Sequence, residues 1–151
     1  MGWQTKPSEF IQTVKADLTK KQKDIVIEAL QGVVLQSPVD TGAFRASHRV
    51  SINQTDQSFN EAEKDKGGGS TISKGTSALS RLVPFSVVYI QTNAPCATAI
   101  EFGQYPNPVK NGSYDKKAKK YVIKSVGGFS QQAPQGVYST TFNYIAQKYG
   151  G

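Results

Sequence analysis

The chain has 151 residues, of which 37% are hydrophobic, with a formal net charge of +7, one cysteine and one histidine. This length suits a single domain over residues 1–151, and one Cys with one His excludes a disulfide framework and argues against a zinc site or other metal centre. No run approaches the roughly 18 consecutive apolar residues of a membrane span, and segment 1–6 lacks a signal-peptide apolar region, so we expect no membrane association and a reducing compartment.

Apolar spacing predicts helical structure near the start of the chain. Pro7 and Ser8 favour a helix start with Ser8 as the N-cap. Phe10, Val14 and Leu18 follow at intervals of four, which places them on one helix face. The polar run 19–24 predicts a break between this helix and the next one.

Residues 25–35 predict a second helix that is apolar nearly all round, because eight of its eleven residues are apolar. A surface helix needs only one apolar stripe. We therefore expect this helix to lie under a sheet and to present its other face to a second subunit. The residues assigned to that subunit interface are Ile25, Leu30, Val33 and Val34.

The middle of the chain alternates between short elements and a polar insertion. Pro38 ends the helix, Asp40 is expected to cap a short turn through Ala46, and residues 48–53 alternate as a strand. Residues 54–76 are polar, charged and Gly-rich, which predicts a flexible insertion that is most mobile over 60–74.

The remaining residues complete an α+β fold. We predict a helical turn over 77–82, strands over 85–91 and 121–124, and a helix over 95–102 ending at Gly103 in a left-handed conformation. Pro134 is expected to open the last helix. The predicted architecture is a long N-terminal helix packed on a small, mostly antiparallel sheet, with short helices and a C-terminal helix.

The positive charge is concentrated in the last third of the chain. Residues 104–151 hold seven lysines and one acid, Asp115, whereas residues 1–103 hold eleven bases and ten acids. A solvated loop accounts for this pattern, and a surface facing DNA or a partner is the alternative. The clustered lysines are Lys116, Lys117, Lys119 and Lys120.

Catalytic patterns are absent from the sequence, so we expect no enzyme and no cofactor. There is no nucleophile elbow, no phosphate-binding loop and no dinucleotide fingerprint. Glu101 lacks a second titratable group nearby in the sequence, and we expect it to form a salt bridge with Arg45 that holds the 38–46 turn against the 95–102 helix. A small hydrolase around His48 remains the alternative.

Three segments carry a resemblance to a known family. They read PVDTGAFRAS at 38–47, VYIQTNAPCATAIEFG at 88–103 and QAPQG at 132–136. Their order and context resemble the tail-completion (head–tail joining, or neck) proteins of tailed bacteriophages, although Phe44 stands in place of the usual Leu and Cys96 in place of the usual Tyr. The matched residues are Asp40, Thr41, Gly42, Arg45, Asn93, Glu101 and Gly103.

The resemblance implies a structural virion protein that forms a ring at the phage neck. Such a ring joins the DNA-filled head to the tail and lets DNA pass through its lumen without sequence recognition. It implies contacts with other neck and tail proteins, assembly in the host cytoplasm, and six copies per ring, with twelve as the alternative. A tail terminator remains open, as does a basic nucleic-acid-binding module using residues 116–124.

Overall fold

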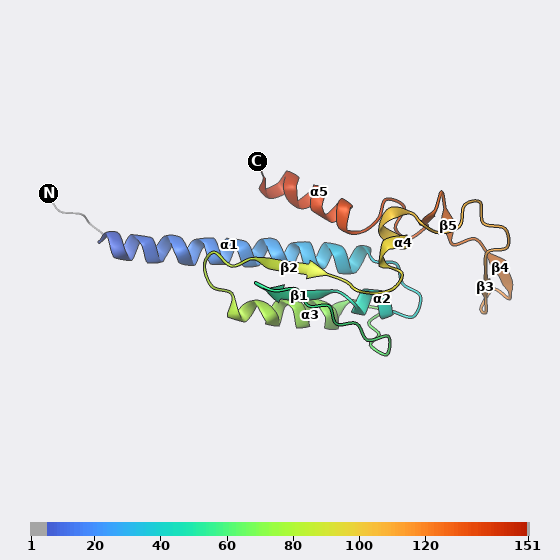
Figure 1. The fold of residues 1–151 in the computed structure, drawn as a ribbon, viewed down its shortest axis with the longest axis horizontal. Helices are drawn as coiled ribbons and strands as arrows, with labels where there is room; N and C mark the ends of the chain where they lie inside the picture. Colours follow the sequence, from blue (N-terminus) through green and yellow to red (C-terminus); the bar gives the residue numbers. More distant parts are fainter. Residues whose placement is uncertain (1–5, 151) are drawn as a thin grey trace.

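The computed structural model describes residues 6–150 and has an α+β fold built along one long helix (Figure 1). Residues 1–5 lie outside the described part of the chain. They make up most of the 1–6 segment, which we expected to lack a signal-peptide apolar region. One two-stranded antiparallel ribbon and the short helices lie near the second half of the long helix, whereas two further ribbons lie beyond its end. The predicted fold class is therefore confirmed.

Helix α1 (Pro7–Gln36) is continuous, so the predicted break over residues 19–24 is wrong. That run consists largely of Lys and Gln, which are good helix formers, and the Thr19 hydroxyl bonds to the Lys15 carbonyl inside the helix. Lys6 rather than Ser8 occupies the N-cap position, because the fixed φ of Pro7 suits the first helical position. Among residues 6–150, no helix combines the length and apolar content that crossing a bilayer requires.

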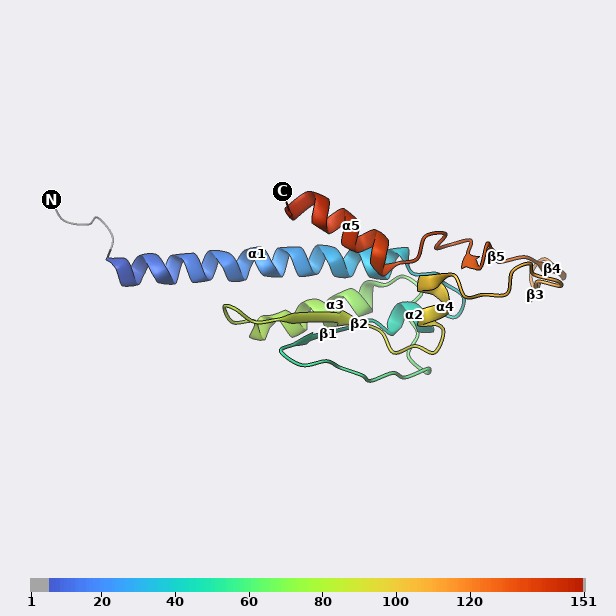
Figure 2. The same ribbon diagram turned by 45° about the horizontal axis from the view of Figure 1, so that its top comes forward.

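Two layers cover opposite sides of the second half of α1, as Figures 1 and 2 show. On one side lies α3 (Gly69–Ala78), which also packs on strand β1 (Arg49–Ile52). Strand β1 pairs antiparallel with β2 (Val88–Gln91), with Val50 opposite Ile90. On the other side lies α5 (Tyr138–Tyr149), which begins four residues after the Pro134 start that we predicted.

Short elements connect these layers. Helix α2 (Ala43–Ala46) precedes β1, the 3₁₀ turn η1 (Leu79–Arg81) follows α3, and α4 (Ala97–Phe102) ends at Gly103 in the left-handed conformation, as predicted. Two hairpins then extend away from the helices. They consist of β3 (Ser113–Asp115) with β4 (Lys120–Val122), and β5 (Ser125–Val126) with β6 (Phe129–Ser130).

Helix α3 occupies much of the segment that we predicted to be flexible. Its N-terminus is held by the Asp65 carboxylate, which accepts the N–H groups of Gly68 and Thr71, both at 2.8 Å. Farther along, Gly75 contacts Leu30 of α1 so closely that a Cβ atom would overlap that side chain. Residues 69–76 are therefore helical, and the loop that we predicted is wrong for them.

The core lies where α1 meets α3, α4 and α5. Leu30 and Val34 are 0% exposed and Val33 is 2% exposed, whereas Ile25 is half-buried. The prediction that Leu30, Val33 and Val34 form a subunit interface is therefore wrong, since the protein's own elements cover both sides of this part of α1. One buried cluster joins Val33 to the chain's C-terminal third, and its members are Val33, Ile100, Ala133 and Val137.

Candidate functional site

Arg45 fastens the end of α1 to the loop that follows β1. Its guanidinium donates to the carbonyl of Lys66 at 2.7 Å, to that of Leu35 at 3.1 Å and to that of Ser37 at 3.0 Å. Carbonyls at a helix C-terminus lack partners inside the helix and carry partial negative charge. A guanidinium from α2 therefore caps α1, which has no basic residue in its own last turn.

Glu101 caps the N-terminus of α5. Its carboxylate accepts the N–H groups of Val137 at 2.8 Å, Tyr138 at 2.9 Å and Ser139 at 2.8 Å. Burial alone would raise the pKa of Glu101, but these N–H donors outweigh burial and hold the pKa below its usual value. The predicted Arg45–Glu101 salt bridge is wrong, because both side chains bind backbone groups instead.

The 40–42 turn depends on Gly42 more than on Asp40. Gly42 has φ +92° and is the N-cap of α2, and a Cβ atom there would lie 2.9 Å from the backbone nitrogen of Lys66. The Thr41 hydroxyl accepts the N–H of Ala43 at 3.2 Å. Asp40 is exposed rather than capping the helix. Only glycine suits both the left-handed backbone and the close approach of the loop.

The other two motif residues lie around α4. Gly103 has φ +65°, and a Cβ atom on it would overlap the ring of Phe129 in β6. Asn93 is exposed in the loop before α4. Gly103 thus lets the hairpin of β5 and β6 lie directly against the end of α4.

His48 is enclosed at the junction of α1, β1 and α5. Its Nε2 lies 2.6 Å from the Ser37 hydroxyl and its Nδ1 lies 2.8 Å from the Tyr138 hydroxyl. Because the Ser37 hydroxyl donates to the carbonyl of Val33, we assign the proton to Nε2, so that Nδ1 accepts from Tyr138. Burial, with the nearby charges of Arg49 and Arg45, lowers the pKa of His48 to about 3.

Burial limits the chemistry that His48, Ser37 and Tyr138 can perform. His48 is 3% exposed and Ser37 is 2% exposed, and burial also raises the pKa of Tyr138. A neutral, covered imidazole between two hydroxyls joins three elements but does not reach a substrate. No local sequence pattern reveals this link, because Ser37 and Tyr138 lie 11 and 90 residues from His48.

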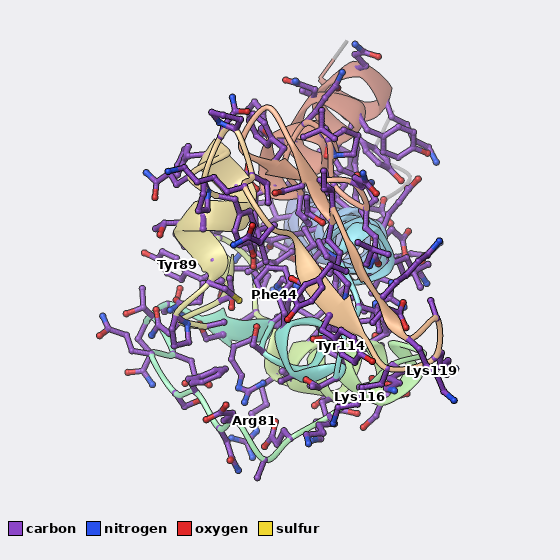
Figure 3. The ribbon with its side chains drawn as sticks, turned by 90° about the vertical axis from the view of Figure 1, so that its right-hand side faces the viewer. Phe44, Arg81, Tyr89, Tyr114, Lys116 and Lys119 are labelled. Atoms are coloured by element: carbon purple, nitrogen blue, oxygen red, sulfur yellow. The ribbon has the colours of Figure 1, made fainter. Side chains whose placement is uncertain are left out.

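The clustered lysines lie on the turn between β3 and β4 and at the first residue of β4, at the end of the molecule farthest from the start of α1 (Figure 1). All four are exposed, as Figure 3 shows for Lys116 and Lys119. The Asp115 carboxylate accepts the N–H groups of Lys117 at 2.8 Å and Ala118 at 3.0 Å. These two bonds lower the pKa of Asp115 and fix the turn.

The first half of α1 is an uncovered arm. Figures 1 and 2 show it extending past every other helix and strand. Val14 follows Phe10 by four residues and Ile11 by three, and Leu18 follows Val14 by four, so these apolar side chains form one stripe. We call this the arm stripe, and its residues with their exposed fractions are Phe10 (61%), Ile11 (51%), Val14 (38%) and Leu18 (47%).

Comparison of the chain with protein-family models, with curated proteins and with solved structures finds no match. Among residues 6–150, no three His, Cys, Asp or Glu side chains come together as a metal site. The candidate functional surfaces are therefore assigned from the geometry of this chain alone.

A shallow apolar groove of about 250 Å³ lies at the opposite end of the body from the arm, where α2, β2, α4 and the start of α5 meet. Phe102 on its rim is 67% exposed, and Thr98 beside it is exposed as well. We call this the α4 groove. Its principal lining residues are Phe44, Ile90, Ala97, Phe102 and Tyr138.

Proposed function

We propose that this protein is a structural subunit of a ring at the neck of a tailed bacteriophage, which joins the head to the tail and lets DNA pass. The uncovered arm stripe on α1 carries this proposal. These four apolar side chains lie on the half of α1 that no other described element covers, and they are stabilised when another chain covers them. The kind of assembly comes from the resemblance of the three motif segments to neck proteins.

The three motif segments support this assignment because they interlock as one unit. Gln132 exchanges two hydrogen bonds with the backbone of Val39, at 2.8 Å and 3.1 Å. The hydroxyls of Ser47 and Thr92 lie 2.6 Å apart. The Gln132 bonds, like the Arg45 and Glu101 contacts, hold backbone rather than arrange reactive groups, as a scaffold requires.

A second copy of the chain is the occupant that we assign to the arm stripe. The arm stripe and the α4 groove are different apolar surfaces at different ends of one protomer. A contact between two different surfaces repeats from copy to copy and closes as a ring when the rotation allows. The arm of each subunit therefore lies in the α4 groove of the next, and we favour six copies, with twelve as the alternative.

Cross-linking tests this arrangement. In a Cys96→Ala background, Val14→Cys on the arm and Thr98→Cys at the α4 groove are combined in one chain and treated with a short bismaleimide, in purified particles and at high protein concentration. A ladder ending at the ring's copy number is expected for the double variant alone. Dimers from Val14→Cys alone would indicate a two-fold contact and overturn the head-to-tail arrangement.

The place in the virion needs its own measurement. Mass spectrometry of purified particles should find the protein at ring stoichiometry, and antibody labelling should place it between head and tail. Infectious particles that lack the protein would overturn the neck assignment. The alternative of a hydrolase gains no support, because His48 and Ser37 are both buried.

A further inference from the structure

The hairpin of β3 and β4 is a narrow basic ribbon that extends beyond the body. Residues 109–124 contain six lysines and one carboxylate, that of Asp115. None of the ion pairs formed within residues 6–150 involves these lysines. Within the described part of the chain, the charge of the hairpin is therefore not balanced by ion pairs. Its lysines are Lys110, Lys116, Lys117, Lys119, Lys120 and Lys124.

The turn geometry presents these charges outward. Asp115 is occupied by two backbone N–H groups, and Lys119 adopts a left-handed backbone conformation with φ +52°. The Asp115 bonds and the Lys119 conformation close a tight turn, and the four lysines in and beside it are all exposed. Figure 3 looks onto this end of the molecule, with Lys116 and Lys119 on the hairpin.

An aromatic pair lies on one face of the same ribbon. Tyr114 and Tyr121 are directly opposite each other in the strand register. Their ring centroids are 5.3 Å apart at an interplanar angle of 68°, an edge-to-face contact. The two side chains are 53% and 67% exposed. The ribbon thus combines exposed positive charge with exposed aromatic rings and hydroxyls.

We propose that this hairpin binds the phosphate backbone of double-stranded DNA without reading its sequence. Lysine ammonium groups act as point charges toward phosphate, and the hairpin has no Arg for bidentate recognition of guanine. The major groove of B-DNA admits a two-stranded β-ribbon. This inference does not depend on the ring.

Fluorescence anisotropy with a labelled 30-base-pair duplex, measured between 50 and 200 mM NaCl, tests the proposal. The wild-type protein is expected to bind with a steep salt dependence. Neutralising the turn (K116Q, K117Q, K119Q and K120Q together) should lower affinity at 50 mM NaCl at least tenfold. It should also reduce the slope of log K against log salt by about 3 to 4, since each phosphate contact contributes about 0.9.

A matched variant removes the same charge from α1, with Lys15, Lys20, Lys21 and Lys23 replaced by Gln. It should retain the wild-type slope, and circular dichroism should show both variants folded. Equal losses in the two variants would overturn the proposal, because net charge alone would then explain binding. Tighter binding to a single strand of the same length, or equal binding to polyglutamate, would overturn it as well.

Discussion

At the scale of residues, the charged and polar groups of this protein act mainly on backbone. Arg45 caps the end of α1, Glu101 caps the start of α5 and Asp65 caps the start of α3. In each case the cap comes from outside the helix, and none of these helices has an N-cap side chain that bonds to its own first turn. The Arg45 and Glu101 caps link separate helices as well as ending them, whereas Asp65 caps α3 from the loop directly before it.

His48 makes stability depend on pH. Its pKa is lowered to about 3 in the folded chain, whereas an unfolded imidazole titrates near 6.5. Between these values the unfolded chain binds more protons, so acid favours unfolding. The free energy of unfolding should fall by up to about 1.4 kcal/mol for each pH unit as the pH drops from 6 toward 4. Urea denaturation at several pH values measures this slope.

His48→Gln provides the comparison, because its amide can still bond to Ser37 or Tyr138 but does not titrate. Carboxylates such as Glu28, whose pKa is lowered to about 2 by hydrogen bonds from Lys148, Tyr149 and Tyr144, contribute equally to both proteins. The variant should therefore show a shallower slope than wild type. Identical slopes would mean that His48 is not held neutral.

At the scale of elements, α3 is stabilised by its neighbours rather than by its own sequence. It consists mainly of Ser, Thr, Gly and Lys, and Gly weakens a helix relative to Ala. Its position between α1 and β1 is set by close packing at Gly75, where a Cβ atom would lie 2.8 Å from Val50 and overlap Leu30. The helix forms because three elements meet there.

Two glycine substitutions in α3 should therefore have opposite effects. Gly75→Ala should destabilise the protein by about 1 to 3 kcal/mol, since overpacking outweighs the gain in helix propensity. Gly69→Ala, at the open start of α3 where no atom would meet the new Cβ, should be neutral or stabilising by up to about 1 kcal/mol. Urea denaturation of both variants measures the difference, and equal effects would contradict this packing.

Elements that depend on local signals could be predicted from the sequence, whereas elements that depend on distant contacts could not. The strand over 48–53, the helix over 95–102 and the left-handed Gly103 were predicted because spacing and turn residues are local signals. Helix α3 was missed, because Asp65 and Leu30 stabilise it from outside. Arg45 and Glu101 were identified as charges needing partners, but their partners are backbone groups up to 38 residues away, which no side-chain pattern reveals.

At the scale of the whole molecule, the two ends differ in chemistry. One end is the arm of α1 with its apolar stripe, and the other is the hairpin with its lysines (Figure 1). The core lies between them, where Val33 contacts the cluster of Ile100, Ala133 and Val137. The core and the proposed assembly surface thus lie on separate parts of the same helix.

Two substitutions on α1 separate these roles. Val33→Asp places a carboxylate in the core and should destabilise the protein by several kcal/mol, about 3 or more, because it has no partner there. Ile11→Asp lies on the exposed arm and should change stability by less than about 1 kcal/mol, yet abolish cross-linking between Val14→Cys and Thr98→Cys when it is added to that double variant. Denaturation and cross-linking together distinguish the two, and similar stability losses would show that the arm belongs to the core.

The continuity of α1 has a geometric consequence. Its 30 residues span about 45 Å at 1.5 Å per residue, so the arm stripe and the core residues are held at a fixed distance and a fixed angle. One inserted residue near position 21 would rotate the stripe by about 100° about the helix axis, whereas seven would nearly restore its direction and move it about 10 Å outward. The number of residues in α1 therefore sets both the distance and the angle between the arm stripe and the core.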